Sequence, residues 1–145
     1  SGLGGLENLG WLTLNDNKIS QIRGLESLHN LKVLNLTNNL IEHVENLDNL
    51  RYLIKLELSN NKIQKIEGLE NLRNLQELFL DRNYIKKLEG INTLEKVIIL
   101  FLESNEISDF NNNSMENLKN LNFLFLNENP LTPQSWICYK KWSRL

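Results

Sequence analysis

The chain is 145 residues long, carries a formal net charge of −2 and contains one cysteine. Its length suits a single domain, its near-neutral charge gives no global basic field to attract a nucleic-acid backbone, and no apolar run reaches the roughly 18 residues that a transmembrane helix needs. The first residues lack the basic and apolar stretches of a signal peptide. The lone Cys138 excludes an internal disulfide and favours a reducing compartment, so we expect a cytoplasmic protein.

One sequence pattern recurs along the chain. The frame L-x-x-L-x-L-x-x-N-x-I, or a close variant, starts at residues 9, 31, 53, 75, 97 and 121, with steps of 22 residues except for the last, which is 24. The chain contains 31 leucines and 24 asparagines. Because they fall at fixed positions of this frame, they indicate structural repeats and not a low-complexity chain.

Residues 1–8 read as the second part of a further, partial repeat. Leu3 and Leu6 match the phase of Leu25 and Leu28 in the next repeat. Repeat proteins need polar terminal caps, because an open end exposes core, and no such cap is visible here. We therefore expect a fragment of a longer protein, or a first core edge that is covered in another way.

Each full repeat predicts one short strand. The L-x-L segments alternate as a strand does and lie at residues 12–14, 34–36, 56–58, 78–80, 100–102 and 124–126. A period of 22 residues leaves room for a turn and an extended or 3₁₀ return path, but not for a full helix. The prediction is therefore an α/β solenoid, in which a curved parallel sheet forms the concave face and an extended or 3₁₀ path forms the convex side.

Two polar columns support this register. Asn17, Asn39, Asn61, Asn83, Asn105 and Asn129 share the ninth position of the frame, where an amide can satisfy turn backbone groups and bridge to the next repeat. Gly24, Gly68 and Gly90 share a later phase with Asn46 and Asn112, and Gly2 fits one repeat earlier. Since glycine and asparagine adopt positive φ most easily, the second column predicts a left-handed backbone position and not a phosphate loop.

The chain changes character after the last frame. The 24-residue step places two extra residues within 109–116, which we expect to form a polar outer loop. Thr132 is a candidate N-cap and Pro133 suits the first helical position. Residues 134–145 are therefore predicted to form a short helix that packs through Trp136, Tyr139 and Trp142, with 130–145 as the C-terminal cap. The two tryptophans alternatively form a docking surface.

The exposed side of the strands is where function is expected in such an architecture. The third, fifth and seventh positions of each frame point outward. The fifth position contains Phe79, Phe101 and Phe125 in consecutive repeats, with Ile99 and Phe123 beside them and four acidic residues around them: Glu57, Glu77, Asp81 and Glu103. An apolar patch with a polar rim favours a partner-binding site. The equivalent surface of the N-terminal half, with Trp11, Thr13, Val33, Asn35 and Lys55, is mixed in character.

Two other interpretations of the phenylalanine column stay open. The rings could stack on one another and only reinforce the sheet. They could also be covered by the C-terminal helix or by a segment outside this sequence.

The repeats resemble a known family. The segment from Asn61 to Leu72, NKIQKIEGLENL, is similar to the 22-residue class of leucine-rich repeats. That class is typified by the regulatory subunit of protein phosphatase type one and includes an axonemal dynein light chain and a spliceosomal A-prime protein. The resemblance covers residues 2–131. Bacterial internalins share the period, but the Gly-Leu-Glu-x-Leu-x-x-Leu phrase favours an intracellular, eukaryotic protein.

The resemblance implies a single leucine-rich-repeat domain over residues 1–145 that binds a partner protein through its concave face, as a regulatory or targeting subunit. The partner could be a phosphatase catalytic subunit or a cytoskeletal or motor protein. An alternative is a structural arm of a larger cytoskeletal, ciliary or centrosomal protein. The resemblance also makes nuclear and ciliary locations alternatives to the cytoplasm. Three consecutive phenylalanines depart from the alternating acidic and aromatic pattern of the phosphatase regulator.

Other chemistry has little support in the sequence. His29 and His43 lie outside the strands without a cysteine partner, so no metal site is expected. Cys138 has no histidine partner in the frame, and carboxylates on an open sheet face lack a desolvated pocket to shift their pKa values. The basic residues are spread, which disfavours direct nucleic-acid binding. We therefore expect no enzymatic activity, no cofactor and no membrane contact.

Overall fold

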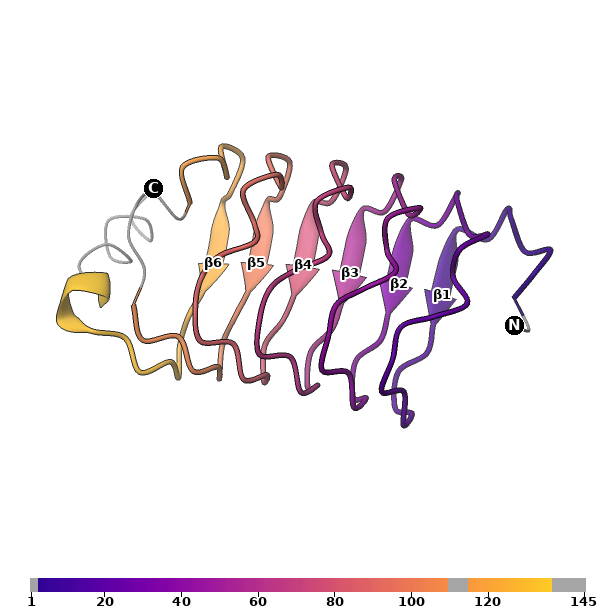
Figure 1. The fold of residues 1–145 in the computed structure, drawn as a ribbon. Coiled ribbons are helices and arrows are strands. Elements are labelled where there is room, and N and C mark those ends of the chain that lie inside the picture. The colour runs from indigo at the N-terminus through magenta and orange to yellow at the C-terminus, as the bar shows by residue number, and fades with distance from the viewer. Residues whose placement is uncertain (1–2, 110–114, 137–145) are drawn as a thin grey trace.

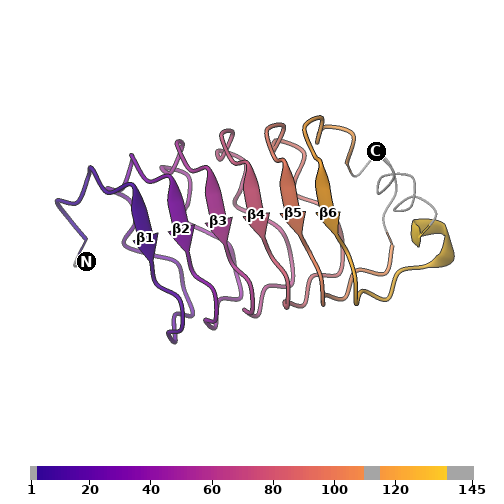
Figure 2. The same cartoon turned by 180° about the vertical axis from the view of Figure 1, so that it is seen from behind.

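The computed structural model describes residues 3–109 and 115–136. Six parallel strands form one sheet in sequence order (Figure 1). They are β1 (Trp11–Thr13), β2 (Val33–Asn35), β3 (Lys55–Glu57), β4 (Glu77–Phe79), β5 (Ile99–Phe101) and β6 (Phe123–Phe125). Strand neighbours in sequence are neighbours in the sheet, so the repeats stack into an elongated solenoid whose described ends lie far apart (Figures 1 and 2). The predicted parallel solenoid is confirmed.

The strand register follows the repeat period. Leu34 pairs with Leu56, and Leu56 with Leu78, each step spanning one repeat. Each strand begins and ends one residue earlier than the predicted L-x-L segment. Inter-repeat hydrogen bonds nevertheless continue past the strands, as when the Leu58 amide donates to the Phe79 carbonyl over 2.9 Å. The predicted and observed strands therefore differ by one residue in their bounds, while the pairing between repeats is as expected.

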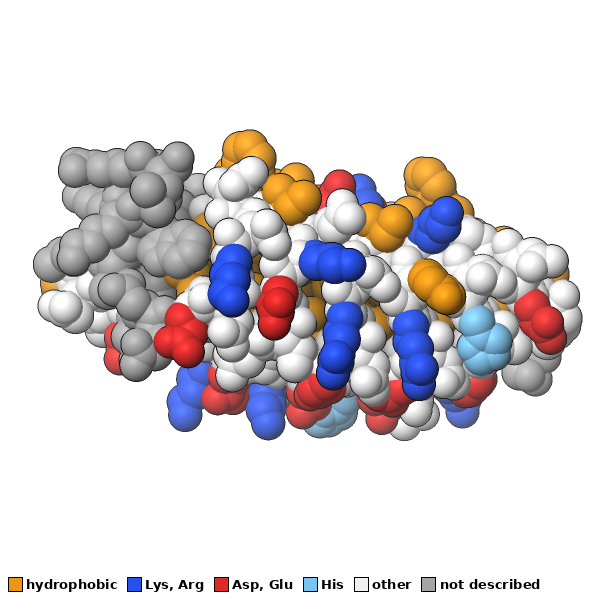
Figure 3. Space-filling view, turned by 90° about the horizontal axis from the view of Figure 1, so that it is seen from above, with side chains coloured by type: hydrophobic (Ala, Val, Ile, Leu, Met, Phe, Trp, Pro, Cys, Tyr) orange, Lys and Arg blue, Asp and Glu red, His pale blue; other side chains and the backbone are white. Residues whose placement is uncertain are grey.

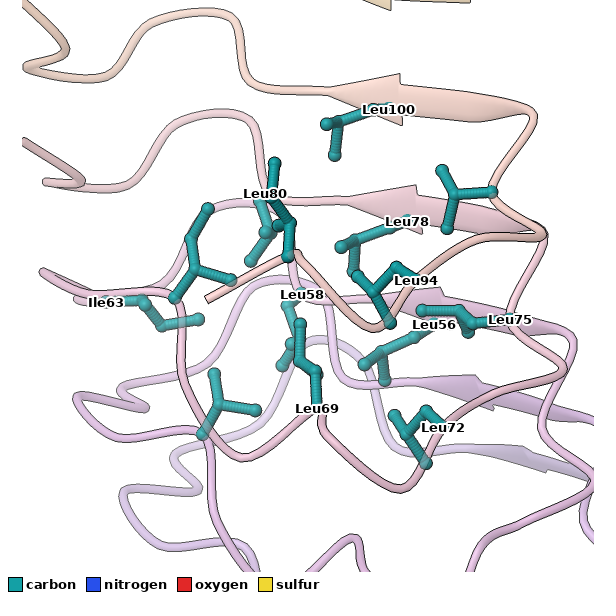
Figure 4. Close-up of a cluster of buried hydrophobic side chains, with 14 of the residues drawn as sticks. Leu56, Leu58, Ile63, Leu69, Leu72, Leu75, Leu78, Leu80, Leu94 and Leu100 are labelled. Atoms are coloured by element: carbon teal, nitrogen blue, oxygen red, sulfur yellow. The ribbon is translucent and has the colours of Figure 1, made fainter. Parts of the chain in front are cut away.

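The core is a stack of leucine and isoleucine layers between the sheet and the return path. In the repeat around β3, Leu53, Leu56, Leu58 and Ile63 are all fully buried, and Figure 4 shows how such side chains from successive repeats converge. The convex path is extended and interrupted by single turns, such as the bond from the Leu72 amide to the Leu69 carbonyl. Burial of each layer against the next is the main stabilising contribution.

The ninth-position asparagines have the predicted structural role from the second repeat onward, whereas Asn17 is exposed and donates to the Leu14 and Asn15 carbonyls of its own turn. The Asn61 side chain is 6% exposed. Its Nδ2 donates to the carbonyls of Leu36 and Leu58, both at 3.0 Å, and its Oδ1 accepts from the Ile41 amide at 3.0 Å. One amide therefore satisfies backbone groups in two neighbouring repeats. Asn39, Asn83, Asn105 and Asn129 repeat this arrangement.

The second polar column is left-handed as predicted. The φ angle is 79° at Gly24, 59° at Asn46, 67° at Gly68 and 73° at Gly90. Gly2 and Asn112 lie outside the described residues. A second left-handed column was not predicted from the sequence. It lies in the turn, directly before each ninth-position asparagine, and consists of Asp16, Asn38, Asn60, Arg82, Ser104 and Glu128. Its mixed composition hides it, because several of these residue types carry no preference for positive φ.

The C-terminal segment starts a helical turn at residues 133–136. The Ser135 amide donates to Thr132 Oγ1 at 3.3 Å, which confirms Thr132 as the N-cap. Trp136, one of the predicted packing residues, is 38% exposed, whereas its neighbour Ser135 is fully buried. Ser135 faces the core edge because its Oγ donates to Asp109 Oδ1 at 2.7 Å. Tyr139, Trp142 and the rest of the predicted helix lie outside the described residues.

Within the part of the chain that the structure describes, no helix has the length and apolar character required to cross a bilayer.

Candidate functional site

The outward-facing side chains of β1–β6, together with the seventh-position residues that follow each strand, form what we call the sheet face. In β2 to β5 the central leucine is buried and its two strand neighbours are half-buried. This alternation follows from the two-residue period of a strand. It brings the predicted site residues together on one surface, which is the predicted concave face.

Phe79, Phe101 and Phe125 form a continuous stack, the aromatic ladder. The ring centroids of Phe79 and Phe101 are 4.9 Å apart with an interplanar angle of 13°, and those of Phe101 and Phe125 are 4.2 Å apart at 10°. The parallel register places these rings directly beside one another. Each ring is only half-buried, so the ladder reinforces the sheet and also offers apolar surface to a partner.

Lys55 closes the ladder at its β3 end. Its Nζ lies 4.9 Å from the centroid of the Phe79 ring, a cation–π contact. The same Nζ pairs with Glu57 at 2.9 Å and with Glu77 at 3.7 Å. The pKa of Lys55 is raised above its ordinary value, chiefly because Nζ donates a hydrogen bond to Glu57, with burial opposing. The sequence analysis assigned Lys55 to the mixed N-terminal half and missed this contact.

The predicted acidic rim divides into two parts. The charges of Glu57 and Glu77 are partly compensated by Lys55. Asp81 and Glu103, beyond the C-terminal ends of β4 and β5, instead accept hydrogen bonds from neutral groups: Ser59 Oγ at 2.5 Å and Asn127 Nδ2 at 2.8 Å. Neither carboxylate forms an ion pair with a described residue at this margin of the ladder.

Asp81 and Glu103 also line a shallow hollow of about 220 Å³. Arg82, Ser104, Asn127 and Glu128 complete its wall. Glu128, which accepts a hydrogen bond from Ser104 at 2.5 Å, adds to the acidic margin and was not predicted. Glu128 falls in the left-handed turn column, at a position that the sequence frame leaves unspecified, so only its spatial neighbours reveal it.

The flanking apolar residues differ in exposure. Phe123 is 52% exposed and lies at the start of β6, whereas Ile99 in β5 is half-buried. At the other end of the sheet Trp11 is 67% exposed, and its indole Nε1 donates to Thr13 Oγ1 at 2.9 Å. The most exposed aromatic side chains of the sheet face therefore lie at its two ends, with the ladder adjoining Phe123.

The side chains of the sheet face suit binding to another protein. Over residues 3–109 and 115–136 there is no group of three or more histidine, cysteine or acidic side chains placed to hold a metal ion. His29 and His43 are exposed, and His43 Nδ1 contacts Glu67 Oε1 at 3.2 Å. Cys138 lies outside the described residues. The surface combines stacked rings, one cation and an acidic margin, which are the components of a protein-recognition surface.

Comparison with known proteins agrees with this description. A family model described as Leucine Rich repeats (2 copies) matches residues 7–52 and 53–93. A search of curated proteins finds no match to the chain.

Solved structures give the same fold. An internalin (inlF) of Listeria monocytogenes is 34% identical with a TM-score of 0.85, over 97% of this chain and 41% of that one. A leucine-rich-repeat protein of Leptospira interrogans is 30% identical with a TM-score of 0.86, over 96% of this chain and 36% of that one. A chain from the octameric complex of latrophilin 3, Unc5D and FLRT2 is 23% identical with a TM-score of 0.82, over 92% of this chain and 42% of that one, and shares the fold alone.

The chain therefore spans less than half the length of these proteins. The match is to repeat proteins in general, and no catalytic family is among them. The finer assignment to the class of the phosphatase regulator stays a prediction, as does the cytoplasmic location.

Proposed function

The chain belongs to the leucine-rich-repeat family, and we propose that it binds one partner protein across the C-terminal half of the sheet face. Leucine-rich-repeat proteins generally act in protein–protein interaction, and one structural neighbour comes from a complex that contains FLRT2. The observation that carries the proposal is the half-buried aromatic ladder beside the exposed Phe123 and the acidic margin.

The ladder would supply the centre of the interface. Aromatic side chains are enriched at hot spots because a large rigid area is desolvated at low entropic cost. Here Phe101 is held between two rings at 4.9 and 4.2 Å, so its orientation is set before binding. Preorganised side chains lose less conformational entropy when a partner arrives.

The acidic margin would select a basic partner segment. Asp81, Glu103 and Glu128 carry charges that no described cation neutralises within ion-pair distance. Complementary charge raises the association rate and makes it sensitive to salt. A partner with a lysine- or arginine-rich segment next to an apolar one fits this arrangement.

The finer roles remain part of the proposal. A regulatory or targeting subunit for a phosphatase, or an attachment module for a cytoskeletal or motor protein, would use the same face. A scaffold arm within a larger protein would instead make its contacts at the ends of the solenoid, where Trp11 is exposed.

An affinity capture from cell lysate with identification by mass spectrometry tests the proposal. The baits are the unchanged chain, a Phe79→Ser/Phe101→Ser/Phe125→Ser variant, and a control variant Trp11→Ser/Val33→Ser/Asn35→Ser on the other half of the same face. Circular dichroism and urea unfolding verify that every bait is folded. We expect a protein that the unchanged chain and the control retain and the phenylalanine variant loses. Identical protein sets from all three baits would exclude the sheet face and favour the scaffold role.

A further inference from the structure

A row of basic side chains runs along the edge of the sheet at the N-terminal ends of the strands. We call it the basic edge, and it consists of Lys32, Arg51, Arg73, Lys96 and Lys119. Each repeat from β2 to β6 contributes one of them, from the short segment that leads into its strand, and all five are exposed. Figure 3, which views this edge directly, shows lysine and arginine side chains aligned along it and most acidic side chains gathered on its convex margin.

The cations of this edge are not held in ion pairs by the described residues. None of the five side chains forms an ion pair within residues 3–109 and 115–136, whereas Lys55, Lys65 and Lys86 elsewhere each contact a carboxylate. The four residues before each strand contain two acidic residues, Glu7 and Glu95, and four further exposed carboxylates, Glu26, Asp48, Glu70 and Glu116, lie three residues earlier. The charge is therefore available to a ligand, although the formal net charge of the whole chain is −2.

The basic edge is hollowed at three places. Asn8, Gly10, Asn30, Lys32 and Tyr52 line one hollow of about 470 Å³. Arg73, Asn74, Asn92, Thr93, Glu95 and Lys96 line a second of about 470 Å³. Gln76, Lys96, Ile98, Lys119, Asn120 and Asn122 line a third of about 390 Å³. Each hollow combines a cation with side-chain amides, which suits carboxylates and peptide groups.

A buried hydroxyl group without a partner lies beside the second hollow. Among the described residues, Thr93 Oγ1 is the one buried side-chain polar atom without a hydrogen-bond partner. Thr93 belongs to the wall of that hollow. A buried hydroxyl without a partner is unfavourable in the free protein, and rotation of the Thr93 side chain toward the hollow would let a ligand supply the missing hydrogen bond.

The backbone of the basic edge is held in place by a column of asparagines that the sequence analysis missed. The Nδ2 groups of Asn30, Asn74 and Asn120 donate to carbonyls of the preceding repeat at 3.0, 2.8 and 2.7 Å. Asn74 Oδ1 also accepts from Lys96 Nζ at 2.7 Å, which orients that cation. The hollows are therefore preformed, which lowers the cost of binding.

We propose that the basic edge binds an extended acidic peptide segment of a protein ligand. Strands of a sheet lie about 4.8 Å apart, so five repeats extend over roughly 19 Å, the length of about six extended residues. The edge is not purely cationic, because Tyr52 is 59% exposed and Ile98 lines a hollow. This mixture, with Glu95 in the row, favours a peptide of acidic and apolar residues over a uniformly sulfated glycan.

The test measures binding of a short fluorescein-labelled peptide that alternates glutamate with leucine, by fluorescence anisotropy at low salt. The matched probe contains glutamine in place of glutamate, and a size-defined heparin oligosaccharide is measured in parallel. The edge variant is Arg51→Gln/Arg73→Gln/Lys119→Gln. The control variant, Lys18→Gln/Lys62→Gln/Lys86→Gln, removes the same charge from exposed lysines outside the basic edge.

We expect the glutamate peptide to bind the unchanged chain and the control variant, and to bind the edge variant at least about tenfold more weakly, a loss of about 1.4 kcal/mol. The glutamine peptide should bind weakly to all three. Equal losses in both variants would reduce the effect to overall charge and overturn the proposal. Binding of heparin through the edge without binding of the peptide would overturn it in favour of a sulfated glycan.

This inference is separate from the function proposed for the sheet face. The Phe79→Ser/Phe101→Ser/Phe125→Ser variant should bind the acidic peptide as the unchanged chain does, because none of the three rings lines the hollows of the basic edge. Loss of peptide binding in that folded variant would place the peptide on the sheet face and not on the edge.

Discussion

At the scale of single residues, the fold depends on polar groups as much as on leucine. Each buried ninth-position asparagine supplies hydrogen bonds that the backbone of the turn cannot make for itself. Asn83, which is 5% exposed, accepts from the Ile63 amide and donates to the Leu58 and Leu80 carbonyls, all at 3.0 Å. No apolar side chain of the same size can satisfy these three groups in two repeats.

Replacement of Asn83 by alanine should therefore be costly. We expect Asn83→Ala to lower the free energy of unfolding by about 2–4 kcal/mol, because buried donors and acceptors lose their partners. The measurement is urea unfolding followed by circular dichroism. Asn74→Ala, which removes two exposed bonds, one to the Arg51 carbonyl and one from Lys96 Nζ, is the control and should cost no more than about 1 kcal/mol. Similar losses for both would argue against the bridging role.

The left-handed column that contains Gly24, Asn46, Gly68 and Gly90 also restricts which residues can occupy it. At Gly90, where φ is 73°, an added Cβ would lie 2.0 Å from the Ile66 carbonyl oxygen. Asn46 occupies the same phase with φ at 59°, and its Nδ2 donates to the equivalent carbonyl, that of Ile22, at 2.7 Å. The column accepts asparagine because the amide turns a close approach into a hydrogen bond.

Two substitutions of Gly90 should consequently differ. Gly90→Ala should lower the free energy of unfolding by about 2 kcal/mol or more, since it combines left-handed strain of about 1–2 kcal/mol with a backbone clash. Gly90→Asn should cost less, because the side chain can reproduce the Asn46 bond. Thermal and urea unfolding of both variants, with Gly10→Ala in open space as control, decide the order. A larger loss for asparagine than for alanine would contradict this account.

At the scale of elements, the sheet is held across strands by side chains as well as by its backbone. Lys55 on β3 contacts Glu57 on its own strand, and Glu77 and Phe79 on β4. These contacts require the ammonium to be protonated. The raised pKa of Lys55 has its main cause in the Glu57 hydrogen bond, and this links the junction of the two strands to pH.

The stabilisation that Lys55 contributes should depend on pH. Because the folded-state pKa of Lys55 is above the unfolded value, its contribution is complete below the ordinary lysine pKa of about 10.4 and is lost as pH rises through the folded value. We expect Lys55→Gln to cost about 0.5–1 kcal/mol near neutral pH, with the difference from the unchanged chain shrinking above pH of about 10.4. Urea unfolding across this pH range measures it. The more exposed Lys65, with Glu67 at 3.9 Å, is the control and should show little effect when changed to Gln. A difference that stays constant through the alkaline range would exclude the ammonium as its source.

At the scale of the whole molecule, stability comes from contacts between neighbouring repeats, so position along the solenoid matters. Leu34 in β2 is fully buried between repeats on both sides. Leu12, its equivalent in β1, is only partly buried against the same core. The first repeat therefore has a neighbouring described repeat on one side only, and its core leucine is covered less completely.

This difference predicts unequal costs for equal substitutions. Leu34→Ala should lower the free energy of unfolding by about 2–5 kcal/mol, whereas Leu12→Ala should cost less than half as much, because less apolar area is removed from water there. Urea unfolding of the two variants of this same chain supplies the comparison. Equal losses would show that the first repeat is as well packed as the second.

Much of the fold could be inferred from the order of residues alone. The repeat period, the parallel register, the asparagine bridge and the left-handed column at Gly24, Gly68 and Gly90 all follow from side-chain identity at fixed spacing. The reason is that a solenoid makes contacts one period apart, so the sequence frame is also a map of neighbours. The fifth-position phenylalanines were predicted to meet for the same reason, and they stack.

Other features of the structure could not be predicted from the repeat frame, because they depend on distances between side chains. Three features required the three-dimensional structure: the contact of Lys55 with Phe79, the burial of Ser135 and the mixed left-handed turn column. The basic edge was missed because its residues lie outside the strand frame: Arg51, Arg73 and Lys119 share one position before their strands, and Lys32 and Lys96 occupy two others. Long flexible side chains from different positions converge on one surface only when the backbone is coiled, so the tertiary structure alone brings these charges together.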